Sequence, residues 1–161
     1  FRSKKSIISL FTILAVLLLA SCSKKEDVCT INAPEVRLEQ QDELKAYIEK
    51  NHPDAVYHSR GFYYEIIAEG NARQAPDACS EVRVNYSGTL SDGTEFDKAT
   101  NVSFNLRTLI PGWRLALPLI REGGIINIVL PADLAYGDAG IDNIIPKGAI
   151  TVFKIELLEV R

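Results

Sequence analysis

Hydrophobic and polar residues follow two different periods along this chain. Residues 81–90, EVRVNYSGTL, place Val82, Val84 and Tyr86 on one side with polar residues between them, which is the two-residue period of a half-buried strand. Three further segments are rich in β-branched and aromatic residues and adjoin glycine or proline: 61–70, 123–131 and 149–160. The pattern therefore predicts several antiparallel strands, with an Asp92-Gly93 type I′ hairpin turn after residue 90.

The segment LEQQDELKAYIEKN, residues 38–51, follows the period of a helix. Leu44 and Ile48 are four residues apart among charged neighbours, so they share one helix face. Gln41 or Asp42 is expected to open the main turn, and the proline of the following NHP ends it. One short amphipathic helix buries little by itself, so we expect it to pack on the domain that follows or on a second copy of the chain.

A second, more apolar helix of about two turns is predicted in GWRLALPLI, residues 112–120. Pro118 is tolerated there only in a first turn or at a kink. A helix this short and apolar is not stable alone, so a sheet must curl around it. The predicted fold class is therefore α+β: a curved antiparallel β-sheet wrapped around one short helix, with an N-terminal helical extension.

The first residues have the pattern of an export signal. FRSKKSIISLFTILAVLLLASC places positive charges before an apolar run from Ile7 to Ala20, which small residues follow. Leu19–Cys22, LASC, resembles the lipobox at which bacterial lipoproteins are cleaved and acylated on the cysteine. We expect a signal peptide at 1–21, lipidation of Cys22 and lipid anchoring in the cell envelope, at the outer membrane or the periplasmic face. An uncleaved membrane anchor is the alternative.

The rest of the chain is expected to contain a tether at 22–37, a helical extension at 38–55 and one main domain at 56–161. An exported chain meets an oxidising compartment, where a pair of cysteines usually forms a bridge. We therefore expect a disulfide between Cys29 and Cys79, and the alternative is two free thiols.

Composition and charge exclude several classes of function. The 161 residues are 47% hydrophobic, enough for a core, and their formal net charge of −3 does not favour binding of nucleic acid. His52 and His58 are not spaced as metal ligands, and the chain has no phosphate-binding glycine loop. The sequence therefore indicates no metal, no cofactor and no nucleophilic triad.

Four stretches together resemble the FKBP-type peptidyl-prolyl cis-trans isomerases. They are VNYSGTLSDGTEFDKA, LIPGWRLALPLIREGG, LPADLAYGDAG and IIPKGAITVFKIELLEV, and they occur in the order and at the distances of that family. The resemblance covers roughly residues 60–161. With the lipobox included, the whole chain resembles a bacterial lipoprotein member of the family.

The resemblance implies a pocket with an aromatic floor and two polar contacts. Trp113 would be the floor, and the Ile110 N–H and the Tyr136 hydroxyl would hold ligand carbonyls. The catalytic positions implied are Tyr86, Phe96, Asp97, Ile110, Trp113 and Tyr136. The substrate-binding positions implied are Val102, Phe104, Leu109, Ile144, Ile145 and Phe153, the two isoleucines forming a solvent-facing lip.

The activity implied is rotation of X–Pro bonds in proline-containing unfolded or exported polypeptides, which assists their folding; macrolide-type inhibitors would bind the same pocket. Aromatic side chains around a carboxylate and hydroxyls suit this reaction, because rotation needs no covalent chemistry. Two alternatives remain at this point. One is a non-catalytic chaperone or scaffold lipoprotein, supported by a homodimer through the N-terminal helix. The other is an assembly lipoprotein of an envelope machine.

Overall fold

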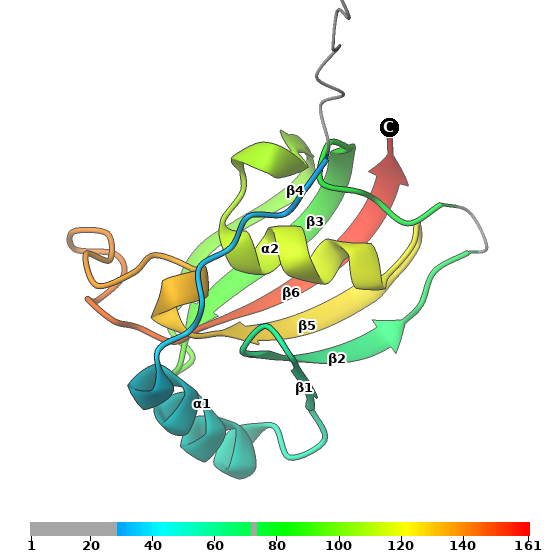
Figure 1. Ribbon diagram of the computed structural model, residues 1–161. Helices are drawn as coiled ribbons and strands as arrows, with labels where there is room; N and C mark the ends of the chain where they lie inside the picture. The colour runs from blue at the N-terminus through cyan, green and yellow to red at the C-terminus, as the bar shows by residue number, and fades with distance from the viewer. Residues whose placement is uncertain (1–28, 72–73) are drawn as a thin grey trace, which may run out of the picture.

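The computed structural model describes residues 29–71 and 74–161, so the expected signal peptide at 1–21 and Cys22 lie outside the described residues. Within them, six strands form one antiparallel sheet in the order β1-β2-β5-β6-β3-β4. The sheet curves around helix α2, which confirms the expected α+β class (Figure 1). The strands are β1 Val56–His58, β2 Phe62–Ala68, β3 Glu81–Leu90, β4 Glu95–Asn105, β5 Ile125–Leu130 and β6 Thr151–Val160. The helices are α1 Leu38–Asn51, α2 Pro111–Ala116 and the short 3-10 helices η1 Leu106–Thr108, η2 Leu117–Leu119 and η3 Ala132–Leu134.

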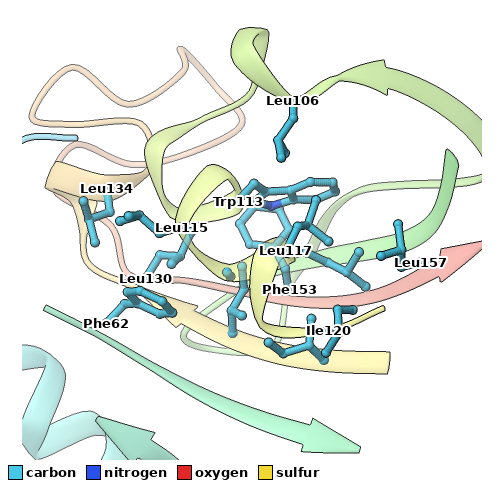
Figure 2. Packing of buried hydrophobic residues seen from close by; sticks show 14 of the residues in the cluster. Phe62, Leu106, Trp113, Leu115, Leu117, Ile120, Leu130, Leu134, Phe153 and Leu157 are labelled. Atoms are coloured by element: carbon cyan, nitrogen blue, oxygen red, sulfur yellow. The ribbon is translucent and has the colours of Figure 1, made fainter. Parts of the chain in front are cut away.

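The concave face of the sheet and the short helix share one hydrophobic core. Trp113 and Leu117 pack with Phe62 of β2, Leu130 of β5 and Leu157 of β6 (Figure 2). The helix approaches the sheet closely at Gly112, where a Cβ atom would collide with the side chain of Leu130. This close approach anchors the start of α2, which carries Trp113, against the sheet.

Pro118 changes the type of the short helix. The α-helix ends at Ala116, and Leu117–Leu119 continues it as a 3-10 helix. Proline has no N–H to donate within a helix and its ring clashes with the preceding turn, so it favours such a break. The predicted two turns are therefore present, but the second turn is 3-10.

The predicted type I′ turn at Asp92-Gly93 is wrong. That turn requires a positive φ at both central residues, but only Gly93 of the two has one, with φ +89°. The Gly93 N–H donates to the Leu90 carbonyl at 2.9 Å, and the Asp92 carboxylate accepts from the Thr94 N–H at 2.8 Å. The side chain of Asp92 therefore stabilises a longer turn that needs a single left-handed glycine.

Strand β4 was not predicted, because its side chains do not alternate regularly. Its pairing with β3 shifts register twice, once between Val84 and Tyr86 and once between Gly88 and Thr89. Each such irregularity resets which residues face the core. The three-residue edge strand β1 was also too short to show a period.

Helix α1 packs on the domain that follows it, which is one of the two arrangements expected from the sequence. Leu44 and Ile48 are buried with Val129 and Ile150, and α1 lies beside the edge formed by β1 and β2 (Figure 1). The helix begins at Leu38, so the predicted opening at Gln41 or Asp42 is wrong. Arg37, with extended backbone angles, occupies the N-cap position without a side-chain cap. None of the described helices is long and apolar enough to cross a membrane.

The described part of the expected tether, residues 29–37, is not a solvated linker along its length. Val36 is buried in the main core, and Ile31 and Ala33 pack against it. The Arg60 guanidinium donates to the Ala33 carbonyl at 2.9 Å. These three apolar side chains and the hydrogen bond thus hold this segment on the domain.

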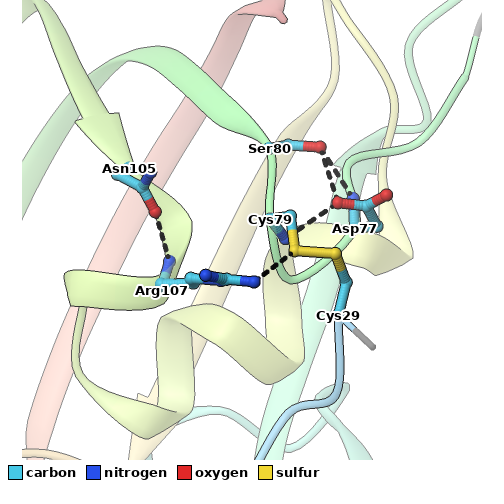
Figure 3. The surroundings of a disulfide bond; sticks show 6 residues. All are labelled: Cys29, Asp77, Cys79, Ser80, Asn105 and Arg107. Carbon is cyan, nitrogen blue, oxygen red and sulfur yellow. Dashed lines mark hydrogen bonds between the residues drawn. A yellow bond between two sulfur atoms is a disulfide. The ribbon is translucent and has the colours of Figure 1, made fainter. Parts of the chain in front are cut away.

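A disulfide fixes the start of this segment, as expected for Cys29 and Cys79. Their Cα atoms are 5.3 Å apart (Figure 3). The Asp77 carboxylate accepts from the Cys79 N–H at 2.8 Å and from the Ser80 hydroxyl at 3.1 Å. Arg107 donates to the sulfur of Cys79 at 3.0 Å. The bond ties the segment before α1 to the connection that precedes β3.

Candidate functional site

An aromatic cavity of about 200 Å³ lies between α2 and the strands β3, β4 and β6. It combines apolar walls with one carboxylate and a few hydroxyl groups. Its lining residues are Tyr86, Asp97, Phe104, Thr108, Leu109, Ile110, Trp113, Tyr136 and Phe153. All of these except Thr108 were implied by the sequence.

Trp113 forms the floor of the cavity. Its indole is 4% exposed, and it meets three rings nearly at right angles. The ring centroids lie 5.1 Å away for Tyr86, 6.2 Å for Phe104 and 5.5 Å for Phe153. Edge-to-face packing of this kind is favourable and holds the rings in defined orientations. The neighbouring rings therefore set the orientation of the floor.

Phe96 supports the aromatic wall from behind. Its ring lies edge-on to Phe153 at 5.6 Å and to Tyr136 at 6.0 Å. Space for it comes from Gly88, where a Cβ would lie 2.7 Å from Phe96 and 2.8 Å from Phe153. Phe96 therefore acts on the cavity through the rings that line it.

A hydrogen bond fixes the position of Tyr86. Its hydroxyl donates to the Asp97 carboxylate at 2.7 Å. Burial raises the pKa of Tyr86, and the hydrogen bond to Asp97 raises it further. Asp97 thus orients a wall residue and keeps it protonated.

Tyr136 lies in a tight loop that follows η3 and precedes residues 141–145, which are called the flap below. The Gly137 N–H donates to the Ala132 carbonyl at 2.8 Å, and the Gly140 N–H to the Tyr136 carbonyl at 3.1 Å. Both glycines have left-handed backbones, with φ +64° and +63°. Burial raises the pKa of Tyr136, and the charge of Asp97 adds to this shift. The Tyr136 hydroxyl is therefore a hydrogen-bond donor at neutral pH.

The flap isoleucines do not both face solvent. Ile144 is 52% exposed, but Ile145 is 3% exposed, so its predicted place on a solvent-facing lip is wrong. Ile145 pairs with Ile141 through two backbone hydrogen bonds of 2.8 Å, and this small bridge turns its side chain inward. Both isoleucines line a separate hollow of about 270 Å³ beside the flap.

Two further positions differ from the implied site. Val102 pairs with Val84 across the β3–β4 ladder and packs, half-buried, on the core. It is not among the residues that line the cavity. Thr108, which lines the cavity, donates its hydroxyl to the Asn105 carbonyl at 2.8 Å. Nothing in its sequence context marks it, although it directly precedes Leu109.

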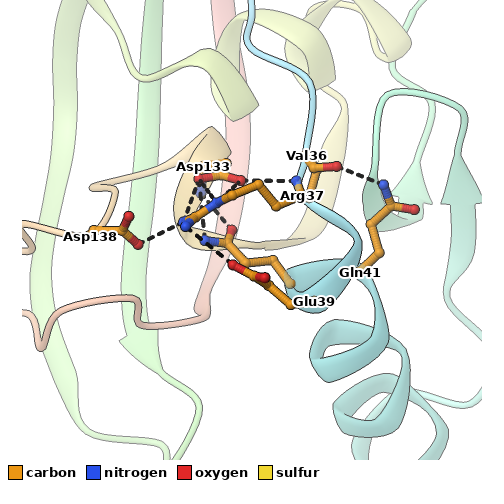
Figure 4. Close-up of polar contacts among 7 residues, drawn as sticks. Val36, Arg37, Glu39, Gln41, Asp133 and Asp138 are labelled. Carbon is orange, nitrogen blue, oxygen red and sulfur yellow. Dashed lines mark hydrogen bonds and ion pairs between the residues drawn. The ribbon is translucent and has the colours of Figure 1, made fainter.

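An ion-pair network joins the N-terminal segment to the loop that carries Tyr136 (Figure 4). The Arg37 guanidinium donates to Asp133 at 2.9 Å and to Asp138 at 2.6 Å. Gln40 accepts from the Asp133 N–H at 2.9 Å and donates to its carboxylate at 3.2 Å. The hydrogen bond from Arg37 holds the pKa of Asp133 below its usual value. No sequence pattern indicated this network, because the residues that it pairs are more than 90 positions apart.

Comparison with known proteins agrees with the geometry. The family described as FKBP-type peptidyl-prolyl cis-trans isomerase matches residues 72–158. The FKBP-type peptidyl-prolyl cis-trans isomerase FkpA of Escherichia coli K12 is 43% identical over 107 residues, which cover 64% of this chain and 39% of FkpA. The outer membrane protein MIP of Legionella longbeachae is 36% identical over 116 residues, covering 70% and 49%. The chain thus spans less than half of these two relatives.

Solved structures show the same likeness. The crystal structure of FkpA from Escherichia coli has a TM-score of 0.69 and 39% identity, covering 76% of this chain and 60% of that one. A peptidyl-prolyl cis-trans isomerase from Pseudomonas syringae pv. tomato has a TM-score of 0.67 and 31% identity. This chain covers 98% of that structure, and the match includes 80% of this chain.

Proposed function

We propose that this chain, which belongs to the family of FKBP-type peptidyl-prolyl cis-trans isomerases, catalyses rotation about X–Pro peptide bonds. One observation carries the proposal above the others. The cavity places a tryptophan floor among perpendicular aromatic walls, and the oxygen-bearing side chains that line it are Asp97, Thr108, Tyr136 and Tyr86. Such a site suits a reaction without covalent intermediates.

The apolar cavity favours the twisted peptide over the planar one. A peptide C–N bond has partial double-bond character, and rotation about it meets a barrier of about 18–20 kcal/mol. In the twisted state the amide resonance is lost and the carbonyl is less polar, so water stabilises that state less than the planar amide. Transfer from water into aromatic surroundings therefore lowers the barrier.

Polar contacts restrict rotation to one side of the bond. Trp113 would support the pyrrolidine ring, while the Ile110 N–H and the Tyr136 hydroxyl hold the flanking carbonyls. Asp97 acts through Tyr86, to which it is hydrogen-bonded. It is not a general base, because no proton is abstracted in the reaction.

A protease-coupled assay on X-Pro-Phe peptides tests the activity. Wild-type chain is expected to accelerate isomerisation, and Trp113→Ala or Tyr136→Phe to lower kcat/KM. A wild-type chain that is inactive, or variants as fast as wild type, would contradict the enzyme proposal. If the inactive chain still suppressed aggregation of an unfolded protein, the chaperone or scaffold alternative would be favoured.

We also propose that the protein is anchored by lipid at Cys22 in the cell envelope and acts on exported polypeptides. The lipobox-like Leu19–Cys22 supports this, and so does the likeness to a relative named as an outer membrane protein. Labelling of cells with a palmitate analogue tests it. Wild-type protein is expected to carry the label, and its absence from wild type, or its retention in Cys22→Ala, would exclude lipidation at this cysteine.

A homodimer through α1 would use the face that the domain leaves exposed. Leu44 and Ile48 are buried against the domain, whereas Leu38 is 78% exposed. Gel filtration of the mature chain beside a Leu38→Glu variant tests this proposal. A dimer of wild type that the variant converts to a monomer supports it, and a wild-type monomer excludes it.

A further inference from the structure

A single guanidinium spans the loop that carries Tyr136. Asp133 and Asp138 lie on either side of Tyr136 in the chain, and Nη2 of Arg37 donates to an oxygen of each, at 2.9 and 2.6 Å (Figure 4). Nε of Arg37 adds a contact of 3.0 Å to the second oxygen of Asp133. Paired, charge-assisted hydrogen bonds of this geometry fix orientation as well as distance.

Arg37 itself is held by the fold, unlike an ordinary surface arginine. Its backbone N–H donates to Asp133 at 3.0 Å, and the preceding Val36 is buried in the core. Gln41 donates to the Val36 carbonyl at 2.8 Å. Gln40, which is 7% exposed, exchanges two hydrogen bonds with Asp133. Exposed ion pairs usually contribute little because both side chains must be ordered, but here the backbone is already in place.

The loop depends on such support. Gly137 and Gly140, which both follow Tyr136 in the chain, have left-handed backbones, and glycine has the largest conformational freedom to lose. Within residues 29–71 and 74–161, the hydroxyl of Tyr136 has no hydrogen-bond partner, so its position follows from the loop and from the ring contact with Phe96. Movement of the loop would therefore move the hydroxyl directly.

We propose that Arg37 is a positioning residue for the isomerase reaction: by bridging Asp133 and Asp138, it holds the Tyr136 hydroxyl where the substrate carbonyl binds. The inference rests on the proposed function. The N-terminal segment would then contribute to catalysis, because its Arg37 holds the two ends of the loop beside the cavity together.

Three variants and one control test this role. Arg37→Ala removes both ion pairs, and Arg37→Lys keeps the positive charge without the planar guanidinium. Asp138→Asn removes the charge of one exposed carboxylate, where folding is not at risk. Arg161→Ala is the matched control, because Arg161 forms an exposed ion pair with Glu159 at the far end of the chain. Urea unfolding checks that every variant is folded under the assay conditions.

The first readout is hydrogen exchange at the Gly137 and Gly140 amides, which needs no substrate. Arg37→Ala is expected to accelerate exchange at both amides by about fivefold or more, while Arg161→Ala leaves both rates unchanged. Arg37→Lys and Asp138→Asn are expected to lie between these limits. Unchanged rates in Arg37→Ala would show that the bridge does not order the loop and would overturn the proposal.

The second readout is kcat/KM on an X-Pro-Phe peptide. Arg37→Ala is expected to lower it about five- to tenfold, and to lower it no further in a chain that already carries Tyr136→Phe. An equal loss in both backgrounds would mean that Arg37 acts elsewhere and would overturn the positioning role. An inactive wild type would overturn the proposed function and the catalytic role together, whereas the exchange rates would still report whether Arg37 orders the loop.

Discussion

The substitution Gly88→Ala tests the aromatic wall with the smallest change that the chain allows. Gly88 faces Phe153 across the β3–β6 ladder, and a Cβ there would lie 2.7 Å from Phe96 and 2.8 Å from Phe153. Carbon atoms in contact prefer separations of at least about 3.5 Å, so each ring would have to retreat by about 0.7–0.8 Å.

Phe153 has no free space for that retreat, whereas Phe96 is only half-buried. Phe153 is 2% exposed and lies edge-on to Trp113 at 5.5 Å, so its displacement would carry into the floor of the cavity. Phe96 is edge-on to Tyr136 at 6.0 Å. Overpacking of this kind costs about 1–3 kcal/mol of unfolding free energy. A displacement approaching 1 Å can lower catalysis by up to about 10²-fold.

Urea unfolding and the protease-coupled peptide assay, both on Gly88→Ala, measure the two effects. Ser87→Ala is the control, because Ser87 is the adjacent residue of β3 and lines a hollow outside the aromatic cavity. Adding Phe96→Leu to Gly88→Ala removes the ring atom nearest the new methyl group, and should recover part of the lost stability. Gly88→Ala with wild-type stability and wild-type kcat/KM would refute the reasoning.

Three further predictions follow from the same structure. Burial and the Asp97 hydrogen bond raise the pKa of Tyr86 above the ordinary 10.0. The contribution of this phenol to stability is therefore complete below pH 10 and is lost as the pH rises beyond it, and Tyr86→Phe should flatten that fall in urea unfolding followed against pH. Cys29 and Cys79 are 50 residues apart, so reduction of their disulfide should lower the unfolding free energy by about 4 kcal/mol, because the unfolded chain regains the entropy of the open loop. Equal urea midpoints with and without reductant would contradict this. Leu44→Ala, at a side chain 1% exposed, should cost about 2–5 kcal/mol by the same method and leave the kcat/KM of the folded protein unchanged.

Local patterns in the sequence were sufficient for most of the fold. Alternation at Val82 and Val84 placed β3, and the i, i+4 spacing of Leu44 and Ile48 placed α1, because both periods arise from backbone geometry that needs no distant partner. The crowded apolar side chains of 112–120 required a sheet around them. The resemblance to a family then named the cavity residues, including Trp113, before their distances were known.

Only the tertiary structure decided where side chains point beside a register shift, and which residues meet across long stretches of sequence. Phe96 and Asp97 are consecutive, yet one supports the wall and the other lines the cavity, since the second register shift between β3 and β4 lies next to them. A regular strand would point them to opposite faces.

The sequence by itself determined the fold class and most of the residues around the cavity, because these follow from local period and from motifs. Only the folded chain decided that Ile145 turns inward and that Arg37 reaches Asp133 and Asp138. The physical reason is that a hydrogen bond between residues about a hundred positions apart leaves no period in the sequence. It exists only once the sheet, the helix and the N-terminal segment have packed together.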